Sequence, residues 1–447
     1  MIVNSEFKFM KIEDLLRPEK GSIAMGPFGS NITVDNFVDH GVPVIQGKQL
    51  KHPFLHEVEY NFLSPQKADS LKNSKARKRD IVITHRGTIG QVGIIHDYSI
   101  YNEYIISQSQ LKFSVDEQIC DPYFVYYYLQ SHYGQYELLK NSTSVGVPSI
   151  ASPTNSVRNI KIPLPDLPIQ KRISTHIKHI DYQILKIKQI QKNLREIISE
   201  LFISWFIKFE PVKIMSGENV PFYMNKENAN LFPKSFEDSE LGLIPTGWKV
   251  GKLGDCLLTI ESGKRPKGGI KEIVNGVPSI GAESIDGVGN FETSDLKYIS
   301  REYFLQMKKG IVKNGDILLY KDGKYAGKVT LVDQDFPFAK CAINEHVFRL
   351  QIKENFTPQY VYSLMSSQQF HWHLEARAIK AAQPGLNRKD VETIPVLIPP
   401  QDVINEFTEK VRPLFNNIFT NAKIIQNLNQ MKETIIPMLF SGKLKVN

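Results

Sequence analysis

Hydrophobic residues recur at spacings of three and four positions in two long stretches of the chain, residues 169–201 and 403–438. This spacing places the apolar side chains on one face of a helix, and a narrow stripe kept over about four heptads is typical of a coiled coil. A helix packed on its own globular domain is the alternative, and it should show a wider stripe. The residues expected at the seam are Ile173, Ile177, Ile180, Ile184, Ile187, Leu194, Val411, Leu414, Ile418, Ile425, Leu428 and Ile435.

Neither stretch contains glycine, and Ile190 belongs to the first stripe as well. Two prolines, Pro413 and Pro437, interrupt the second stretch. Proline inside a helix removes a backbone hydrogen bond and crowds the preceding turn. Pro413 therefore predicts a kink or a new start in the second helix.

A different pattern precedes each long helix. Short runs of β-branched and aromatic residues, separated by Gly, Asp and Asn, predict strands. These runs are residues 81–84, 93–95, 104–106 and 111–113 in the first half, and 317–320, 329–332 and 347–350 in the second. A short helix is expected after them, near residues 123–132 and 359–368, and a proline-rich boundary then leads into each long helix.

The two halves of the chain resemble each other in sequence. Gly-Val-Pro-Val-Ile at residues 41–45 returns as Gly-Val-Pro-Ser-Ile at residues 276–280, and Asp80 with its strand returns at Asp316. Solenoid repeats have periods of about 20–50 residues, so a longer period indicates duplicated domains. We therefore expect an α+β chain with two similar β-rich domains. Two long helices should join them as an antiparallel coiled coil, in a pseudo-two-fold internal duplication.

Composition narrows the class of protein. The 447 residues carry a net charge of +8, which permits an anionic partner without requiring one. The three cysteines form no CxxC pair, so neither a disulfide framework nor a zinc site is expected. No signal-peptide core is present, and no apolar run approaches the roughly 18 residues of a membrane span. We expect a soluble cytoplasmic chain without a membrane partner.

The sequence offers no catalytic constellation, and we assign no catalytic or metal-ligating residue. The segment 323–329 resembles a phosphate-binding loop, but it has three residues between its glycines and a valine after its lysine. Such a loop needs four residues and then Ser or Thr. We interpret the segment as a turn between strands. His371 and His373 have no assignable third ligand, which favours a surface helix.

Basic residues gather between the predicted strands, and they are the candidate DNA contacts. Arg and Lys attract phosphates, and Arg, Lys, Gln and Asn read base edges in the major groove. Solvated surface charge is the alternative for many of them. The predicted DNA-binding residues are Lys75, Arg77, Lys78, Arg79, His85, Arg86, Lys264, Arg265, Lys267, Lys321, Lys324, Arg377, Lys380, Arg388 and Lys389.

Four segments carry a family resemblance. They are Leu-Phe-Ile-Ser-Trp-Phe-Ile-Lys-Phe-Glu-Pro at 201–211, Leu-Gly-Leu-Ile-Pro-Thr-Gly-Trp at 241–248, Met-Lys-Glu-Thr-Ile-Ile-Pro-Met-Leu-Phe-Ser-Gly-Lys-Leu at 431–444 and Gly-Pro-Phe-Gly-Ser at 26–30. Together they closely resemble the specificity subunit of type I restriction-modification systems, over nearly the whole chain.

The resemblance implies a sequence-specific, non-catalytic subunit that reads a bipartite site in double-stranded DNA. Target-recognition domains would span residues 1–165 and 245–400, helical spacers 166–209 and 401–447, and a linker 210–244. Two modification subunits would dock and bind S-adenosylmethionine, and restriction subunits would add ATP- and Mg²⁺-dependent cleavage. This chain itself would bind no cofactor. The alternative is a self-contained methyltransferase or nuclease with its own recognition domains, which would need a further catalytic domain.

Overall fold

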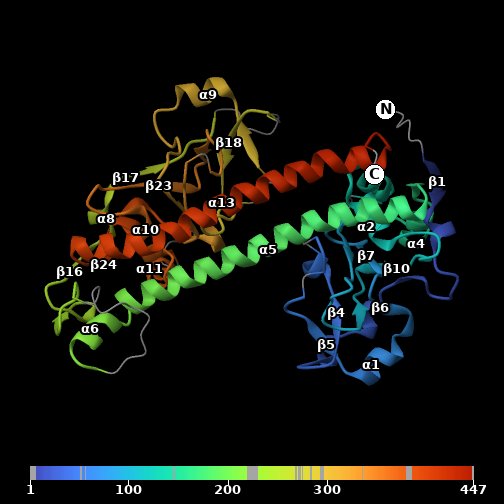
Figure 1. Cartoon of the computed structure of the whole chain (residues 1–447), viewed down its shortest axis with the longest axis horizontal. Coiled ribbons are helices and arrows are strands. Elements are labelled where there is room, and N and C mark those ends of the chain that lie inside the picture. Colours follow the sequence, from blue (N-terminus) through green and yellow to red (C-terminus); the bar gives the residue numbers. More distant parts are fainter. Residues whose placement is uncertain are drawn as a thin grey trace. The chain divides into compact units, whose positions relative to one another are not determined.

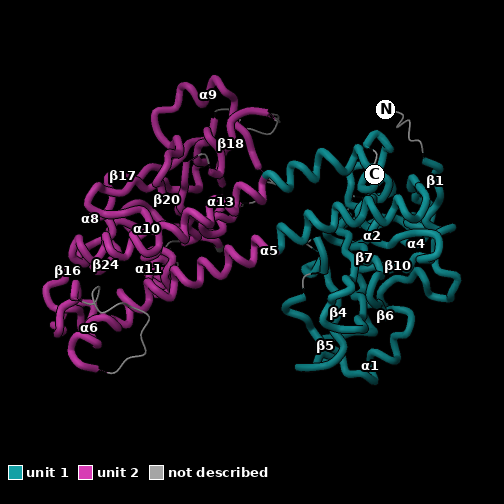
Figure 2. Tube along the Cα trace, in the orientation of Figure 1, with its two compact units in different colours: residues 1–185, 427–447 teal, residues 186–426 magenta. Residues whose placement is uncertain are grey.

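The computed structural model describes residues 7–50, 53–55, 57–143, 146–218, 230–266, 269, 273, 275–281, 284–291, 296–334, 336–378 and 385–444. The chain divides into two compact units. Unit 1 comprises residues 1–185 and 427–447, and unit 2 comprises residues 186–426. Each unit contains part of both long helices, α5 and α13 (Figures 1 and 2).

Unit 1 is built on two main sheets. A four-stranded sheet has the order β2-β10-β7-β8, and a five-stranded sheet has the order β3-β5-β4-β9-β6. Strands β1 and β13 form a two-stranded antiparallel pair beside them. The strands are β1 Lys8–Lys11, β2 Ile23–Met25, β3 Phe37–Val38, β4 Val42–Ile45, β5 Asn61–Leu63, β6 Lys75–Arg77, β7 Ile81–Thr84, β8 Val92–Ile94, β9 Glu103–Ile106, β10 Gln110–Phe113, β11 Ser142–Thr143, β12 Ser149–Ile150 and β13 Lys161–Leu164.

Unit 2 repeats this arrangement. Its four-stranded sheet has the order β17-β23-β20-β21, and β18 pairs antiparallel with β19 and parallel with β22, as β4 does with β5 and β9. The strands are β14 Phe236–Ser239, β15 Gly242–Pro245, β16 Lys249–Lys252, β17 Leu257–Ser262, β18 Val277–Ile280, β19 Lys297–Ile299, β20 Ile317–Tyr320, β21 Val329–Leu331, β22 Ala342–Ile343, β23 Val347–Ile352 and β24 Pro395–Ile398. The predicted duplication is confirmed, and so are the predicted strands.

Short helices lie between and after the strands of both units. Several begin at a side-chain cap: Ser64, Ser131, Ser300 and Thr357 each accept a hydrogen bond from a backbone N–H of the first turn. The short helices are α1 Pro65–Ser70, α2 Pro122–Gln130, α3 His132–Leu139, α4 Pro153–Arg158, α6 Glu210–Met215, α8 Leu253–Cys256, α9 Arg301–Gln306, α10 Pro358–Met365, α11 Gln368–Ala378 and α12 Arg388–Glu392. His371 and His373 lie on α11, as predicted, and residues 323–325 form a single 3-10 turn between β20 and β21.

The two long helices are α5 (Leu167–Phe206) and α13 (Gln401–Phe440). The contacts between them show that they run antiparallel, since residues later in α5 contact residues earlier in α13. In unit 1, Lys432 Nζ lies 2.6 Å from Asp181 Oδ1. In unit 2, Gln191 Nε2 donates a hydrogen bond of 2.9 Å to the carbonyl oxygen of Ile418, and the rings of Phe202 and Phe407 are 5.9 Å apart.

The prediction that Pro413 restarts the second helix is wrong, since α13 continues through Pro413 and Pro437. Pro413 is exposed, and so is Glu409, whose carbonyl group loses its helical donor. Water can therefore satisfy this carbonyl, which lowers the cost of the proline.

Each predicted seam residue is at least half-buried. Ile173, Ile177, Ile184, Val411 and Ile418 are buried, while Ile180, Ile187, Leu194, Leu414, Ile425, Leu428 and Ile435 are half-buried. The stripe has one departure in unit 2: Ile190 is 49 % exposed, and the polar Gln191 is buried instead. The side-chain amide of Gln191 donates a hydrogen bond to the Ile418 carbonyl, which satisfies part of that buried polar group.

The helices also contribute to the core of each unit. Ile173, Ile177 and Phe440 join the cluster around α2 and the four-stranded sheet of unit 1. In unit 2, Phe202 and Phe407 join the corresponding cluster. Helix pairing and packing on the β-rich part therefore occur together. The boundaries at residues 165, 209, 244 and 400 stay predictions.

No helix in the described part of the chain is long and apolar enough to cross a membrane.

Candidate nucleic-acid interface

Three loops of unit 1 surround a cavity of about 360 Å³. The first loop follows β2, the second connects β9 to β10, and the third follows β7. The residue after β4, Gln46, also lines the cavity. The lining is Pro27, Phe28, Gly29, Ile32, Phe37, Val44, Gln46, Gly47, Thr84, Arg86, Thr88, Gln91, Ser107, Gln108, Ser109 and Gln110.

Glycine allows the first two loops to approach each other. A Cβ atom added at Gly26 would lie 1.9 Å from the carbonyl oxygen of Ser107. One added at Gly29 would lie 2.4 Å from Oε1 of Gln108. Both distances are far inside van der Waals contact. At Gly26 the neighbour is backbone, so only glycine fits, whereas at Gly29 a larger residue would require the Gln108 side chain to move. The Gly-Pro-Phe-Gly-Ser motif therefore has a geometric reason at this site.

The cavity contains two kinds of glutamine. Gln91 and Gln110 are fixed, because their side chains bond Thr84 Oγ1 at 3.0 and 3.2 Å. Gln46 and Gln108 are different: within the described part of the chain, neither side-chain amide has a hydrogen-bond partner. These two amides can therefore bond a ligand.

The third loop is held in place by its backbone. The N–H of His85 donates to the carbonyl of Ser109, and the N–H of Ile150 donates to the carbonyl of His85. The ring of His85 is buried against the carbonyl of Gln108, and burial lowers its pKa. The ring is therefore neutral at pH 7, so His85 serves to position this loop.

Two exposed side chains stand at the rim of the cavity. Arg86 is exposed, and it has no ion-pair partner in the part of unit 1 that the structure describes. Phe28 is 83 % exposed, which is unusual for an aromatic residue. A free guanidinium suits phosphate or guanine, and an exposed ring suits a base or sugar.

The same loops occur in unit 2, with the same backbone bonds. The N–H of Lys321 donates to the carbonyl of His346, and the N–H of Leu386 donates to the carbonyl of Lys321. Bridges between the third loop and the segment before the short helix join Arg86 to Ser149 and Asp322 to Gly385. Gly263 again has no room for a Cβ atom, because the carbonyl oxygen of Ile343 would lie 2.1 Å away.

The side chains on these loops differ between the units. Where unit 1 has Phe28, Gln108, Ser109 and Arg86, the register places Arg265, Glu345, His346 and Asp322 in unit 2. The latter are linked: Arg265 lies 2.8 Å from Glu345, and His346 Nδ1 lies 2.7 Å from Asp322. One scaffold therefore presents a mainly neutral surface in unit 1 and a charged network in unit 2.

The predicted basic cluster at residues 75–79 is not a loop. Lys75 and Arg77 belong to strand β6, and only the next residues form a turn. Lys75 Nζ lies 2.7 Å from both Asp69 and Glu103. Arg77 is exposed and Lys78 half-buried, and neither has an ion pair within the described residues.

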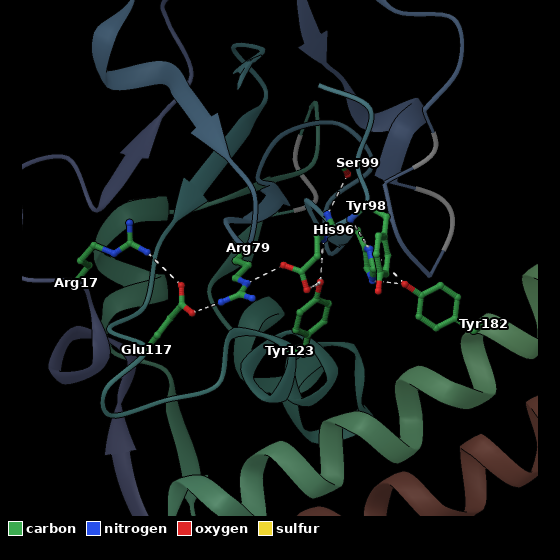
Figure 3. Close-up of polar contacts among 9 residues, drawn as sticks. Arg17, Arg79, His96, Tyr98, Ser99, Glu117, Tyr123 and Tyr182 are labelled. Carbon is green, nitrogen blue, oxygen red and sulfur yellow. Dashed lines mark hydrogen bonds and ion pairs between the residues drawn. The ribbon is translucent and has the colours of Figure 1, made fainter. Parts of the chain in front are cut away.

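Arg79 lies within a polar network between β-rich loops and α2 (Figure 3). Its guanidinium bonds Asp97 at 2.7 Å and also Glu117, which in turn bonds Arg17. These carboxylates, Asp97 above all, raise the pKa of Arg79. Lys75 and Arg79 thus have structural partners, while Arg77 and Lys78 keep their charge available.

The other predicted DNA contacts of unit 2 are distributed over several elements. Lys264 is exposed beside Arg265, and Lys321 Nζ lies 5.1 Å from the ring centroid of Phe348. Lys324 lies in the turn Gly323–Tyr325. Arg377 donates to the carbonyl of His373 on α11, Arg388 pairs with Glu392 at 2.7 Å, and Lys389 is exposed. Lys267 and Lys380 lie outside the described residues.

Phe28, Gln46 and Gln108 are absent from the predicted contacts, because none of them carries a positive charge. A usable signal existed. Gln46 follows the β4 motif, which the sequence repeats, and Phe28 lies in the Gly-Pro-Phe-Gly-Ser segment. A polar residue directly after a strand of a repeated motif, such as Gln46, is a sequence signal for this kind of position.

Neither unit offers reactive cysteines or a metal cluster within its described residues. No group of three or more His, Cys, Asp and Glu side chains there could hold a metal ion. The cysteines are buried and unpaired, and burial raises the pKa of the Cys256 and Cys341 thiols to about 12. Such thiols are protonated at pH 7 and are poor nucleophiles.

Known proteins share this organisation. The family model "Type I restriction modification DNA specificity domain" matches residues 4–196 and 245–430. The type I restriction enzyme MjaIX specificity subunit of Methanocaldococcus jannaschii is 28% identical over 386 residues, covering 83% of this chain and 78% of that protein. The EcoBI specificity subunit of Escherichia coli is 23% identical over 364 residues, covering 76% and 69%.

A solved structure has the same fold. The crystal structure of the S subunit of a type I restriction-modification system from M. genitalium aligns with a TM-score of 0.55 at 13% identity, over 99% of this chain and 98% of that chain. The family model covers most of the chain in two copies, and each copy corresponds to one β-rich repeat followed by most of one long helix. The chain belongs to the specificity subunits of type I restriction-modification systems.

Proposed function

We propose that this chain selects a bipartite DNA site, with one half read by the loop cluster of each unit. The observation that carries the proposal is the repetition of one three-loop scaffold with different side chains. A duplicated scaffold with identical side chains would select two identical half-sites. Exchange of Gln108, Ser109 and Arg86 for Glu345, His346 and Asp322 favours two different ones.

The chemistry of each cluster suits DNA. Amides and guanidinium groups bond base edges, and carboxylates accept hydrogen bonds from cytosine amino groups. The positive net charge of +8 supplies the sequence-independent attraction to phosphates. The pairs Arg265–Glu345 and His346–Asp322 would have to open or to bind as a unit when DNA arrives.

Catalysis would come from other subunits. Two modification subunits would bind S-adenosylmethionine and methylate the site, and restriction subunits would bring ATP and Mg²⁺. The two long helices would provide the docking surface and hold the half-sites at a fixed spacing, in a complex located in the cytoplasm. The chain itself would bind DNA and turn nothing over.

An exchange of recognition segments tests this function. The modified motif is first determined by methylome sequencing of a strain that carries the wild-type chain with its modification subunits. Residues 245–400 are then replaced by the corresponding segment of a relative. A gapped motif that changes in one half only is the expected result. A motif without a gap, or changes in both halves, would overturn the proposal.

The rival function, a self-contained methyltransferase or nuclease, has a direct test. The purified chain is incubated with DNA, Mg²⁺ and S-adenosylmethionine, without other subunits. Binding without methylation or cleavage is expected. Methylation or cleavage activity that elutes with the chain, and that no other fraction contains, would favour the rival.

A further inference from the structure

The cavity of unit 1 offers two unpartnered glutamine amides beside two glutamines whose side chains are bonded. Thr84 Oγ1 donates to Gln91 and accepts from Gln110, and Ser107 donates to Gln110. Gln46 and Gln108 line the same cavity without a partner in the described residues. Their backbones are fixed: the N–H of Gln46 bonds Gln49, and the carbonyl of Gln108 bonds the ring of His85. The two amides thus have anchored backbones and free side chains.

A primary amide presents a donor and an acceptor in one plane. This arrangement matches the edge of adenine, whose N6 amino group donates and whose N7 accepts. Thymine, cytosine and guanine do not offer that pair on one base in the major groove. An unpaired amide at a cavity between loops is therefore better suited to adenine than a lysine or an aspartate would be.

We propose that the side-chain amides of Gln46 and Gln108 are specificity-determining and select adenine in the half-site bound by unit 1. Arg86 at the rim attracts the neighbouring backbone phosphates. This inference rests on the proposed function and adds which residues read bases, and which base they prefer. Neither glutamine belongs to the positively charged set that the sequence predicted.

The test uses the complete complex in its host strain. Gln46→Ala, Gln108→Ala and the double variant are each expressed with the modification subunits, and the methylome is sequenced. The expected result is relaxation at one or two adenine positions of the unit 1 half. The loss of discrimination should be roughly 5- to 150-fold per amide, as for one bidentate contact. The other half and the spacing should be unchanged.

Gln118→Ala is the matched control, because Gln118 is an exposed glutamine of unit 1 outside the cavity. Its motif should equal that of the wild type. An unchanged motif in the double variant of Gln46 and Gln108 would overturn the inference. The inference would also be overturned if the motif changed only in the other half, the one that the exchange experiment assigns to residues 245–400.

A second pair of variants covers the possibility that truncation prevents methylation. Gln46→Glu and Gln108→Glu keep the shape of the side chain and replace the donor by an acceptor. The preferred base should then move from adenine towards cytosine, whose N4 amino group only donates. Selection of the purified variants against a randomised duplex library gives this readout without methylation. Retention of adenine by both variants would overturn the inference, while a gapped wild-type motif would leave the proposed function standing.

Discussion

Lys432 on α13 bonds Asp181 on α5, with Nζ 2.6 Å from Oδ1, inside unit 1. Asp181 is completely buried, and the side chain of Lys432 is 18% exposed. Lys432 Nζ also lies 5.9 Å from the ring centroid of Tyr127 on α2. One ion pair thus joins the two long helices at a position where an apolar seam would otherwise continue. A buried pair of this kind adds little net stability, but it penalises any other register of the helices.

Lys432→Met should destabilise the chain by about 3–5 kcal/mol, because it leaves the Asp181 carboxylate buried without its partner. Urea unfolding measures this loss. Lys186→Met is the matched control, since Lys186 is an exposed lysine on α5, and its effect should stay within about 0.5 kcal/mol.

The double variant Asp181→Leu with Lys432→Met tests how much the ion pair itself contributes to the free energy of unfolding. It should recover most of the loss, because apolar residues of similar volume replace a buried ion pair at little cost. Equal loss of unfolding free energy in the single and double variants would contradict this, because removing the unpaired carboxylate would then restore nothing.

Unit 2 contains a buried charge within its four-stranded sheet, Arg349 of β23. It is 4% exposed and bonds Asp316 and Glu261, the latter at 2.9 Å. The register places Lys112 at this position in unit 1, facing Asp80 and, in place of the second carboxylate, Ala24. The number of carboxylates therefore follows the donor geometry of the cation: one carboxylate faces the lysine, and two face the arginine, whose planar guanidinium can donate to both.

Arg349→Lys should cost about 1.5–3 kcal/mol, since a lysine cannot satisfy both carboxylates. Adding Glu261→Ala copies the arrangement of unit 1 and should restore part of that stability. A double-mutant cycle on unfolding free energies measures the coupling. Additive effects of the two changes would contradict the compensation.

His96 gives unit 1 an acid-sensitive point (Figure 3). Burial lowers the pKa of His96 from about 6.5 to about 4. The backbone N–H of Tyr98 donates to Nδ1, so the neutral ring carries its proton on Nε2 and donates to Tyr182 on α5, 2.8 Å away. A second proton, on Nδ1, would face the Tyr98 N–H.

His96 therefore binds a proton near pH 6.5 in the unfolded chain but only near pH 4 in the folded chain. The contribution of this ring to stability is fully present above pH 6.5, falls as the pH decreases through this window, and is smaller by about 3 kcal/mol near pH 4. His96→Gln should flatten this part of the stability profile, measured by urea unfolding at several pH values. His40→Gln, at an exposed histidine, is the control and should leave the slope unchanged.

The sequence predicts the parts of this fold that depend on local pattern. Runs such as residues 81–84 contain β-branched residues and become strands, and the period of three and four predicts both long helices. It does not predict pairing between distant residues. Glu103 and Glu117, which neutralise Lys75 and Arg79, lie 28 and 38 residues further along the chain. Their effect, and the convergence of Gln46 with Gln108, depends on the tertiary fold.

That pairing separates the predicted basic cluster into two kinds of residue, and a charge reversal can distinguish them. Arg77→Glu with Lys78→Glu should weaken DNA binding and reduce its salt slope by up to about 2, since each phosphate contact contributes about 0.9. Folding should be unaffected, because neither side chain has an ion pair within the described residues. Fluorescence anisotropy at several salt concentrations measures affinity and slope together.

Lys75→Glu with Arg79→Glu is the matched pair, with the same change in net charge. It places new carboxylates against Asp69, Glu103, Asp97 and Glu117. Like charges at hydrogen-bonding distance repel, so the melting temperature of this variant should fall, whereas that of the first should not. Equal salt slopes for the wild type and the Arg77/Lys78 variant would show that these two charges do not contact phosphate, and the predicted contact would then be limited to the loops around the cavity.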